Sequence, residues 1–220
     1  RHFDQGVVLM RKVLFLAALS AAAIAVPGQA AVTLSAVDGT VPYSGPTGGP
    51  LFFDFEAATP RWNGAVVSGN VGGIQAQPLG STGNYASAGP AAGTPRVFSL
   101  TGIGSVAAVS FIWGSVDTYN TLDVLAGDTV LATFTGIDAN NPANGNQTAP
   151  AQNPLVTLSF TGDSRTAVTG LRFSSSQNAF EFDNLFVAVP EPSTWAMMIG
   201  GFGLLGAAAR RARKVRAVYA

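Results

Sequence analysis

The chain has 220 residues, of which 47% are hydrophobic and only 11% are charged. This length allows one domain with targeting segments, and the absence of cysteine excludes a disulfide framework and a thiolate metal site. Residues 31–189 carry ten acids and four arginines, a net charge of −6, which argues against nucleic acid as a partner because nucleic-acid binding needs a basic surface.

The N-terminal part has the pattern of a secretory signal. Translation is expected to start at Met10, so that residues 1–9 are an upstream extension. Residues 10–30 form the predicted signal peptide: Arg11 and Lys12 precede an apolar run over 13–26, and the small residues Gly28 and Ala30 predict cleavage after Ala30. An uncleaved membrane anchor is the alternative, but fourteen apolar residues are short for a span.

The central part predicts an all-β fold. Residues 31–50 are rich in Gly, Pro, Ser and Thr and are interpreted as a flexible lead-in. Residues 51–188 contain short β-type runs at about ten-residue spacing, separated by turn residues such as Gly127-Asp128. This pattern predicts an antiparallel, jelly-roll-like β-sandwich. The expected strands are 51–57, 95–100, 106–113, 121–125, 129–134, 155–160, 168–173 and 179–189.

A long polar stretch interrupts these strands at residues 139–153, with the sequence ANNPANGNQTAPAQN. Loops of this length are usually either mobile surface excursions or binding loops, and both alternatives remain open at this point.

The C-terminal segment, residues 189–220, has three parts in a fixed order. Pro190, Glu191 and Pro192 come first, and the two prolines keep this segment out of a helix. An uncharged apolar run over 195–209 follows, about 22 Å long as a helix, which predicts a transmembrane helix with some bilayer thinning. Arg210, Arg211, Arg213 and two further bases then place the end in the cytoplasm. The alternative is a buried hydrophobic helix, although such a helix seldom lacks a polar face.

The residues V-P-E-P-S-T-W-A at 189–196, with the glycines at 200–203 and the arginine cluster, resemble the PEP-CTERM sorting signal in its PEPxxWA form. The carrying residues are Pro190, Glu191, Pro192, Trp195, Arg210, Arg211 and Arg213. The resemblance implies export by a Gram-negative bacterium, transient anchoring in the inner membrane and processing by an exosortase. It then implies delivery to the cell surface or the extracellular matrix.

Catalytic machinery is scarce in the sequence. The only histidine, His2, precedes the predicted mature domain, so neither a Ser-His-Asp nor a Cys-His arrangement is expected. Paired carboxylates acting on an extracellular polysaccharide remain the enzymatic alternative. The sequence favours a non-catalytic domain, and no cofactor is expected beyond a structural Ca²⁺.

Four acids suggest that calcium site. Asp54 and Glu56 lie at i, i+2 in the first expected strand, and Glu181 and Asp183 do so in the last. If these strands pair, the four carboxylates converge, and carboxylate oxygens suit Ca²⁺. The pattern is similar to first- and last-strand motifs of jelly-roll carbohydrate-binding and MAM-like domains. Alternatively, both pairs face water.

The run at 111–125 (FIWGSVDTYNTLDVL), together with 179–184 (AFEFDN), resembles the globular part of exosortase-dependent surface proteins. Trp113 and Tyr119, with Asp117 and Asn120, are residue types of a sugar site, because aromatic faces stack on sugars and polar groups bind hydroxyls. Trp113 equally fits the core, and Asp117 and Asn120 equally fit a turn. The expected function is therefore glycan or matrix binding, or a structural role. Ice binding is a further alternative that would need a flat threonine array, for which Thr121, Thr129, Thr133 and Thr135 are few.

Overall fold

The computed structural model describes residues 30–190, 198–206 and 210. The predicted upstream extension and nearly all of the predicted signal peptide therefore lie outside the described residues, as does much of the C-terminal segment. Residues 198–206 are helical. Within the described ranges, no helix combines the length and the apolar character that crossing a membrane requires.

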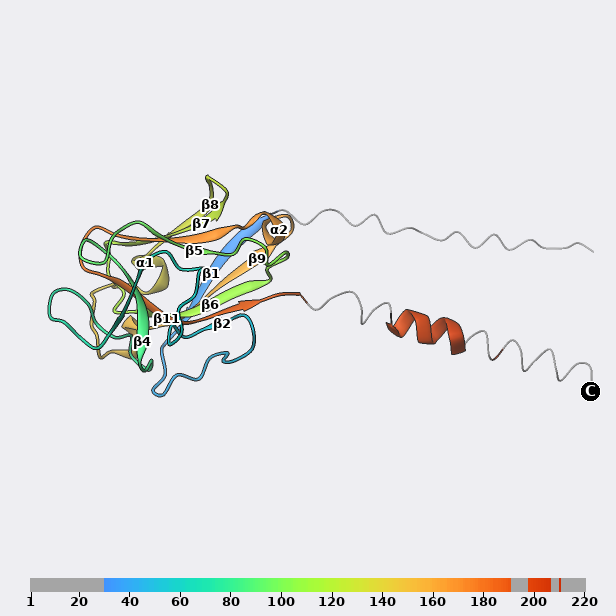
Figure 1. Cartoon of the computed structure of the whole chain (residues 1–220), viewed down its shortest axis with the longest axis horizontal. Helices are drawn as coiled ribbons and strands as arrows, with labels where there is room; N and C mark the ends of the chain where they lie inside the picture. Colours follow the sequence, from blue (N-terminus) through green and yellow to red (C-terminus); the bar gives the residue numbers. More distant parts are fainter. Residues whose placement is uncertain (1–29, 191–197, 207–209, 211–220) are drawn as a thin grey trace, which may run out of the picture.

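The described domain is a sandwich of two antiparallel sheets, which confirms the predicted all-β fold (Figure 1). The larger sheet has the spatial order β1 (Ala31–Val37), β9 (Leu155–Thr161), β6 (Ala108–Gly114), β11 (Phe180–Ala188), β4 (Asn84–Ala88) and β3 (Ala65–Ser68), with β2 (Phe52–Phe53) also on β11. The smaller sheet has the order β5 (Arg96–Ser99), β10 (Gly170–Ser175), β7 (Asn120–Ala126) and β8 (Thr129–Thr135). Three short helical turns connect strands: α1 (Gly136–Ala139), η1 (Pro150–Gln152) and α2 (Ser164–Ala167).

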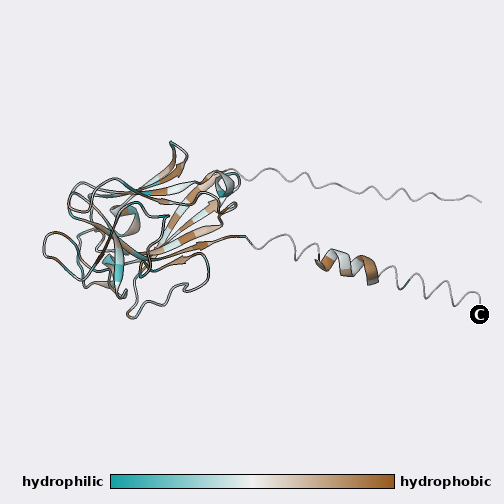
Figure 2. Cartoon of the chain, in the orientation of Figure 1, coloured by the Kyte–Doolittle hydropathy of each residue, from teal (hydrophilic) through white to brown (hydrophobic). Residues whose placement is uncertain are grey.

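Alternation of side chains builds the inner faces of the sheets. Hydrophobic and polar residues alternate along many of the strands (Figure 2), and β9 shows this period of two in its burial. Strands β6 and β11 are buried almost continuously, because connecting segments cover the outer face of the larger sheet as well. Gly127 adopts φ +58 in the two-residue turn between β7 and β8, as its sequence predicted.

An aromatic cluster forms the centre of the core. The ring of Phe173 in β10 stacks on that of Phe182 in β11, with centroids 3.9 Å apart, and so joins the two sheets. Phe111 contacts both rings edge-on. Aromatic side chains bury large apolar areas, and this gives a cysteine-free domain a substantial core.

All eight expected strands are present in some part, but four features differ from the sequence prediction. Residues 31–37, interpreted as part of a flexible lead-in, form the edge strand β1, which pairs along its whole length with β9. The second and third differences are β3 and β4, two strands that the sequence analysis did not predict. The expected strand at 51–57 is reduced to two paired residues, because Phe55 turns the chain with φ 59.

The register also defines two ends of the sandwich. Strand β11 runs from Phe180 at one end to Ala188 at the other, where Ala188 pairs with Ala108. Since Ala108 also pairs with Ser159 and β1 begins opposite Thr161, β1 begins at the same end at which β11 finishes. The sorting segment therefore continues from this end, and the start of β11 lies at the opposite one (Figure 1).

Candidate functional site

A polar cavity of about 190 Å³ lies where β6 ends and β11 begins. Four segments line it, and most of the side chains that they contribute are amides, carboxylates or hydroxyls. The lining residues are Gly73, Ile74, Gln75, Ser115, Asp117, Tyr119, Asn144, Gly145, Gln147, Asn178, Ala179 and Glu181. They include two acids and no base, so the cavity carries negative charge when its carboxyl groups are ionised.

Glu181 is the deepest charged group of the cavity, with 2% of its surface exposed. Its Oε1 accepts a hydrogen bond from the backbone N–H of Ala76 at 2.8 Å, and its Oε2 accepts one from the Ser115 hydroxyl at 3.2 Å. Burial raises the pKa of Glu181 to about 7, the charge of Asp117 adds to this rise, and the hydrogen bonds oppose it. Glu181 therefore gains or loses a proton near neutral pH.

Asp117 and Tyr119 form a second polar pair at the cavity wall. The Tyr119 hydroxyl donates to Oδ2 of Asp117 at 2.6 Å. Burial raises the pKa of Asp117, while the bond from Tyr119 lowers it. The loop backbone passes directly over this carboxylate, since a Cβ atom at Gly145 would lie only 2.5 Å from Oδ1. Glycine is needed there for that close approach and for its φ of +66.

The predicted sugar-binding residues are therefore only partly together. Asp117 and Tyr119 line the cavity, but Trp113 is fully buried and stacks on Phe180 at 4.2 Å, so it belongs to the core. Asn120 is also fully buried. Its side chain accepts a bond from the backbone of Asp117 and donates to Ala179, so it shapes the turn beneath the cavity and does not face a ligand.

The long polar stretch at 139–153 is a fixed wall of the cavity, held by two buried amides. Asn153 accepts bonds from the backbone N–H groups of Leu79 and Ser115 and donates to two carbonyls of its own loop. Gln152 accepts from the backbone of Asn144 and donates to the carbonyl of Pro142. These anchors bring Asn144 and Gln147 to the cavity, and the loop's length and polarity were the only sequence signals for them.

The four acids of the predicted calcium site do not converge as expected. The pairing of β2 with β11 is confirmed. Asp183 lies near Asp54 and Glu56, whose charges, together with burial as the larger cause, raise its pKa to about 8. Glu181 instead faces the polar cavity and Asp117. Across the described ranges, no group of three or more Asp, Glu, His or Cys side chains is arranged to hold a metal ion.

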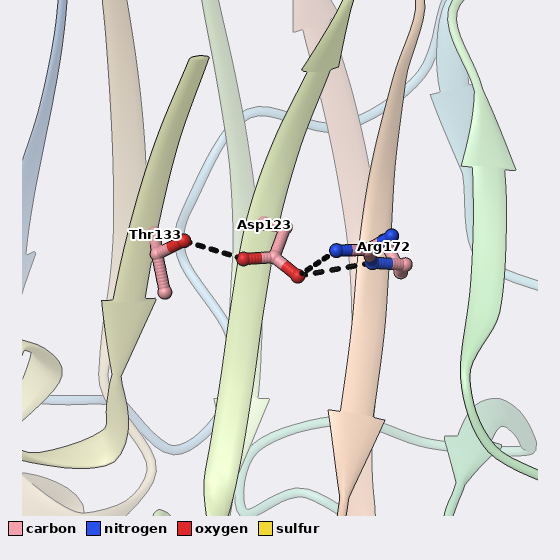
Figure 3. A network of polar contacts seen from close by, with 3 residues as sticks. All are labelled: Asp123, Thr133 and Arg172. Carbon is pink, nitrogen blue, oxygen red and sulfur yellow. Dashed lines mark hydrogen bonds and ion pairs between the residues drawn. The ribbon is translucent and has the colours of Figure 1, made fainter. Parts of the chain in front are cut away.

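The threonines considered for ice binding do not form an open array. The Thr133 hydroxyl donates to Asp123 at 2.6 Å, and Asp123 pairs with Arg172 at 2.7 Å on the neighbouring strand (Figure 3). Thr135 bonds to Asp138 at the start of α1. An ion pair therefore interrupts this face of the smaller sheet, and two of the four hydroxyls are engaged within the protein.

Comparison with known families identifies the C-terminal segment. The family model described as the PEP-CTERM protein-sorting motif matches residues 188–214. This chain carries a PEP-CTERM protein-sorting motif. The match contains the predicted motif residues, although 191–197 and those from 211 onward lie outside the described structure.

The PEP-CTERM motif implies export, membrane-associated sorting and processing by exosortase, and thus an extracellular or surface protein. No curated protein and no solved structure matches the chain. The polar cavity is therefore the feature of the sandwich from which a function can be inferred.

Proposed function

We propose that the sandwich of this PEP-CTERM protein is a non-catalytic module that binds an extracellular polysaccharide in the polar cavity. The observation that carries the proposal is the lining of that cavity by amide, carboxylate and hydroxyl groups, which are the groups that bind sugar hydroxyls. Tyr119 contributes an aromatic ring to the same wall.

The size and charge of the cavity limit the class of sugar that it can bind. At about 190 Å³ it is smaller than the roughly 300 Å³ at which pockets for drug-sized molecules begin, so it suits one sugar unit or a chain end. Asp117 and Glu181 are its charged lining residues. They favour neutral sugars or amino sugars over uronic acids, whose carboxylates they would repel.

The position of the cavity is consistent with a surface-exposed binding module. Ala179 and Glu181 line the cavity at the start of β11, whereas the sorting segment follows Ala188 at its end. Nine residues of strand span about 30 Å. A sandwich held by its sorting segment would thus present the cavity away from the point of attachment.

The test is a glycan array probed with the mature, secreted protein, followed by titration of any glycan that binds. Tyr119→Phe removes the hydroxyl that contacts Asp117 and is expected to weaken binding about 5- to 10-fold, corresponding to one lost hydrogen bond. Tyr43→Phe is the matched control, because Tyr43 donates to the carbonyl of Pro46, outside the cavity. Equal affinity of the two variants would contradict the assignment of the site.

A polysaccharide-cleaving enzyme is the second candidate, and the properties of Glu181 favour it. A buried carboxylic acid with a pKa of about 7 beside a second carboxylate is a suitable general acid. The same glycans distinguish the two functions: Glu181→Gln would abolish turnover and retain binding in an enzyme. The binding module shows no turnover in either form.

A further inference from the structure

Strand β11 joins the sorting signal without a linker. Its last two residues, Val187 and Ala188, pair with Val109 and Ala108 of β6. Pro190 begins the Pro-Glu-Pro triplet, so Val189 is the one residue between the ladder and the motif.

This end of β11 is held firmly in the fold. The strand is an interior one, with β6 along one edge and β4 and β2 along the other. The N–H of Val187 donates to the carbonyl of Leu51 at 2.9 Å, and the carbonyl of Ala188 accepts from Ala107 at 2.7 Å. The Val187 side chain is buried in the core.

A peptidase that takes its substrate as an extended segment uses the substrate's backbone N–H and C=O groups. Pro190 and Pro192 have no N–H to offer. On the N-terminal side of the triplet, backbone donors therefore begin at Val189 and continue into Ala188 and Val187, whose groups the folded sheet already occupies.

We propose that the segment recognised by exosortase extends back over Val187–Val189, so that the end of β11 must leave the sheet before the tail is removed. Local opening of a strand end needs less free energy than unfolding of the domain. The folded sandwich therefore slows its own processing without preventing it. This inference does not depend on the ligand of the cavity.

The first test inserts an eight-residue Gly-Ser spacer between Val189 and Pro190 of the full-length precursor. The spacer provides free backbone before the triplet, so conversion to the processed form, followed by pulse-chase, is expected to be several-fold faster. The matched control carries the same spacer between Gly48 and Gly49, where the chain is exposed and has open space around both residues. Replacement of Pro190, Glu191 and Pro192 by alanine should leave the precursor unprocessed, which shows that the assay reports exosortase.

The second test locks the end of β11. Ala108 and Ala188 are a registered pair, and the wild-type chain has no cysteine, so Ala108→Cys with Ala188→Cys introduces the one disulfide that the protein can form. The oxidised precursor should be processed at least tenfold more slowly, and the reductant or the added spacer should restore the rate. Ser35→Cys with Thr157→Cys is the control, because this registered pair locks β1 to β9 and leaves β11 free.

Two results would overturn the proposal. One is equal processing of the oxidised and reduced β11 variants. The other is a spacer variant that is converted no faster than its control. The spacer variants do not depend on correct folding of the cysteine variants, so they decide the question alone if the disulfide does not form.

Discussion

Glu181 shows how one residue links the fold to the chemistry of the cavity. Its position in an interior strand removes it from water, while Ala76 and Ser115 donate hydrogen bonds to its carboxylate. Glu181 interacts electrostatically with three titratable side chains, those of Asp117, Tyr85 and Tyr119. The result is a carboxyl group that is half protonated near neutral pH, in a site where a ligand would meet it.

This raised pKa predicts a pH-dependent stability. The ordinary pKa of a glutamate, 4.5, applies to the unfolded chain, and the folded value is about 7. The folded state thus binds the proton more tightly, so the contribution is complete below pH 4.5 and is lost as pH rises through 7. We expect the contribution of Glu181 to the free energy of unfolding to fall by roughly 1–3 kcal/mol between pH 5 and pH 8.

Chemical denaturation at several pH values tests this expectation. Glu181→Gln keeps an oxygen acceptor but cannot ionise, so the variant should show a smaller slope with pH. Part of the slope should remain, because burial also raises the pKa of Asp183 to about 8. A slope that is unchanged in Glu181→Gln would mean that another group controls it.

At the scale of the element, the loop at 139–153 decides the shape of the cavity. Its buried anchors Gln152 and Asn153 replace the contacts that a regular element would make. Gly145 then brings the loop backbone against Asp117, closer than any other residue would allow.

Gly145→Ala is therefore expected to destabilise the protein and to weaken binding. The new Cβ meets the Asp117 carboxylate and also suffers the strain of a positive φ, a combination that costs about 2–3 kcal/mol. Gly102→Ala is the control, because Gly102 has a φ of +80 in open space and adds the strain alone, about 1 kcal/mol. Equal denaturation midpoints for the two variants would show that the contact with Asp117 is unimportant.

At the scale of the whole molecule, the predicted mature N-terminus and the sorting motif lie at one end of the sandwich, and the cavity lies at the other. The predicted mature N-terminus, Ala31, begins β1 at the end where β11 finishes. Only Val189 separates the domain from the sorting motif, and for this reason we expect the folded sheet to slow processing.

The binding of a structural calcium ion between the first and last parts of the domain remains a prediction. An ion would have to draw Asp54 and Glu56 toward Asp183 and join the first and last parts of the domain. A free calcium concentration a hundredfold above Kd would stabilise the folded state by about 2.7 kcal/mol. This would raise the melting temperature by several degrees. Asp183→Asn should remove the difference between calcium and chelator, and magnesium should substitute poorly. Identical melting curves in calcium and chelator would leave these acids as ordinary charges.

The sequence by itself determined the sorting signal and the fold class of this protein. The sorting signal is a linear pattern around Pro190 and Trp195, which can be recognised without a folded structure. The β-sandwich follows from side-chain alternation and turn residues such as Gly127, which act over a few positions. Strand β1 was missed because its uncharged residues adjoin a stretch rich in glycine and proline, and the pairing with β9 is a distant one.

Only the tertiary structure decided where the polar groups meet. Glu181 and Asp183 are two residues apart, yet one faces Asp117 and the other Asp54, because different loops cover the two positions of β11. Trp113 has the residue type of a sugar platform, but its place on an inner face puts it in the core. The cavity gathers side chains from four distant segments, and their proximity depends on sheet order and loop anchoring, neither of which has a local signature in the chain.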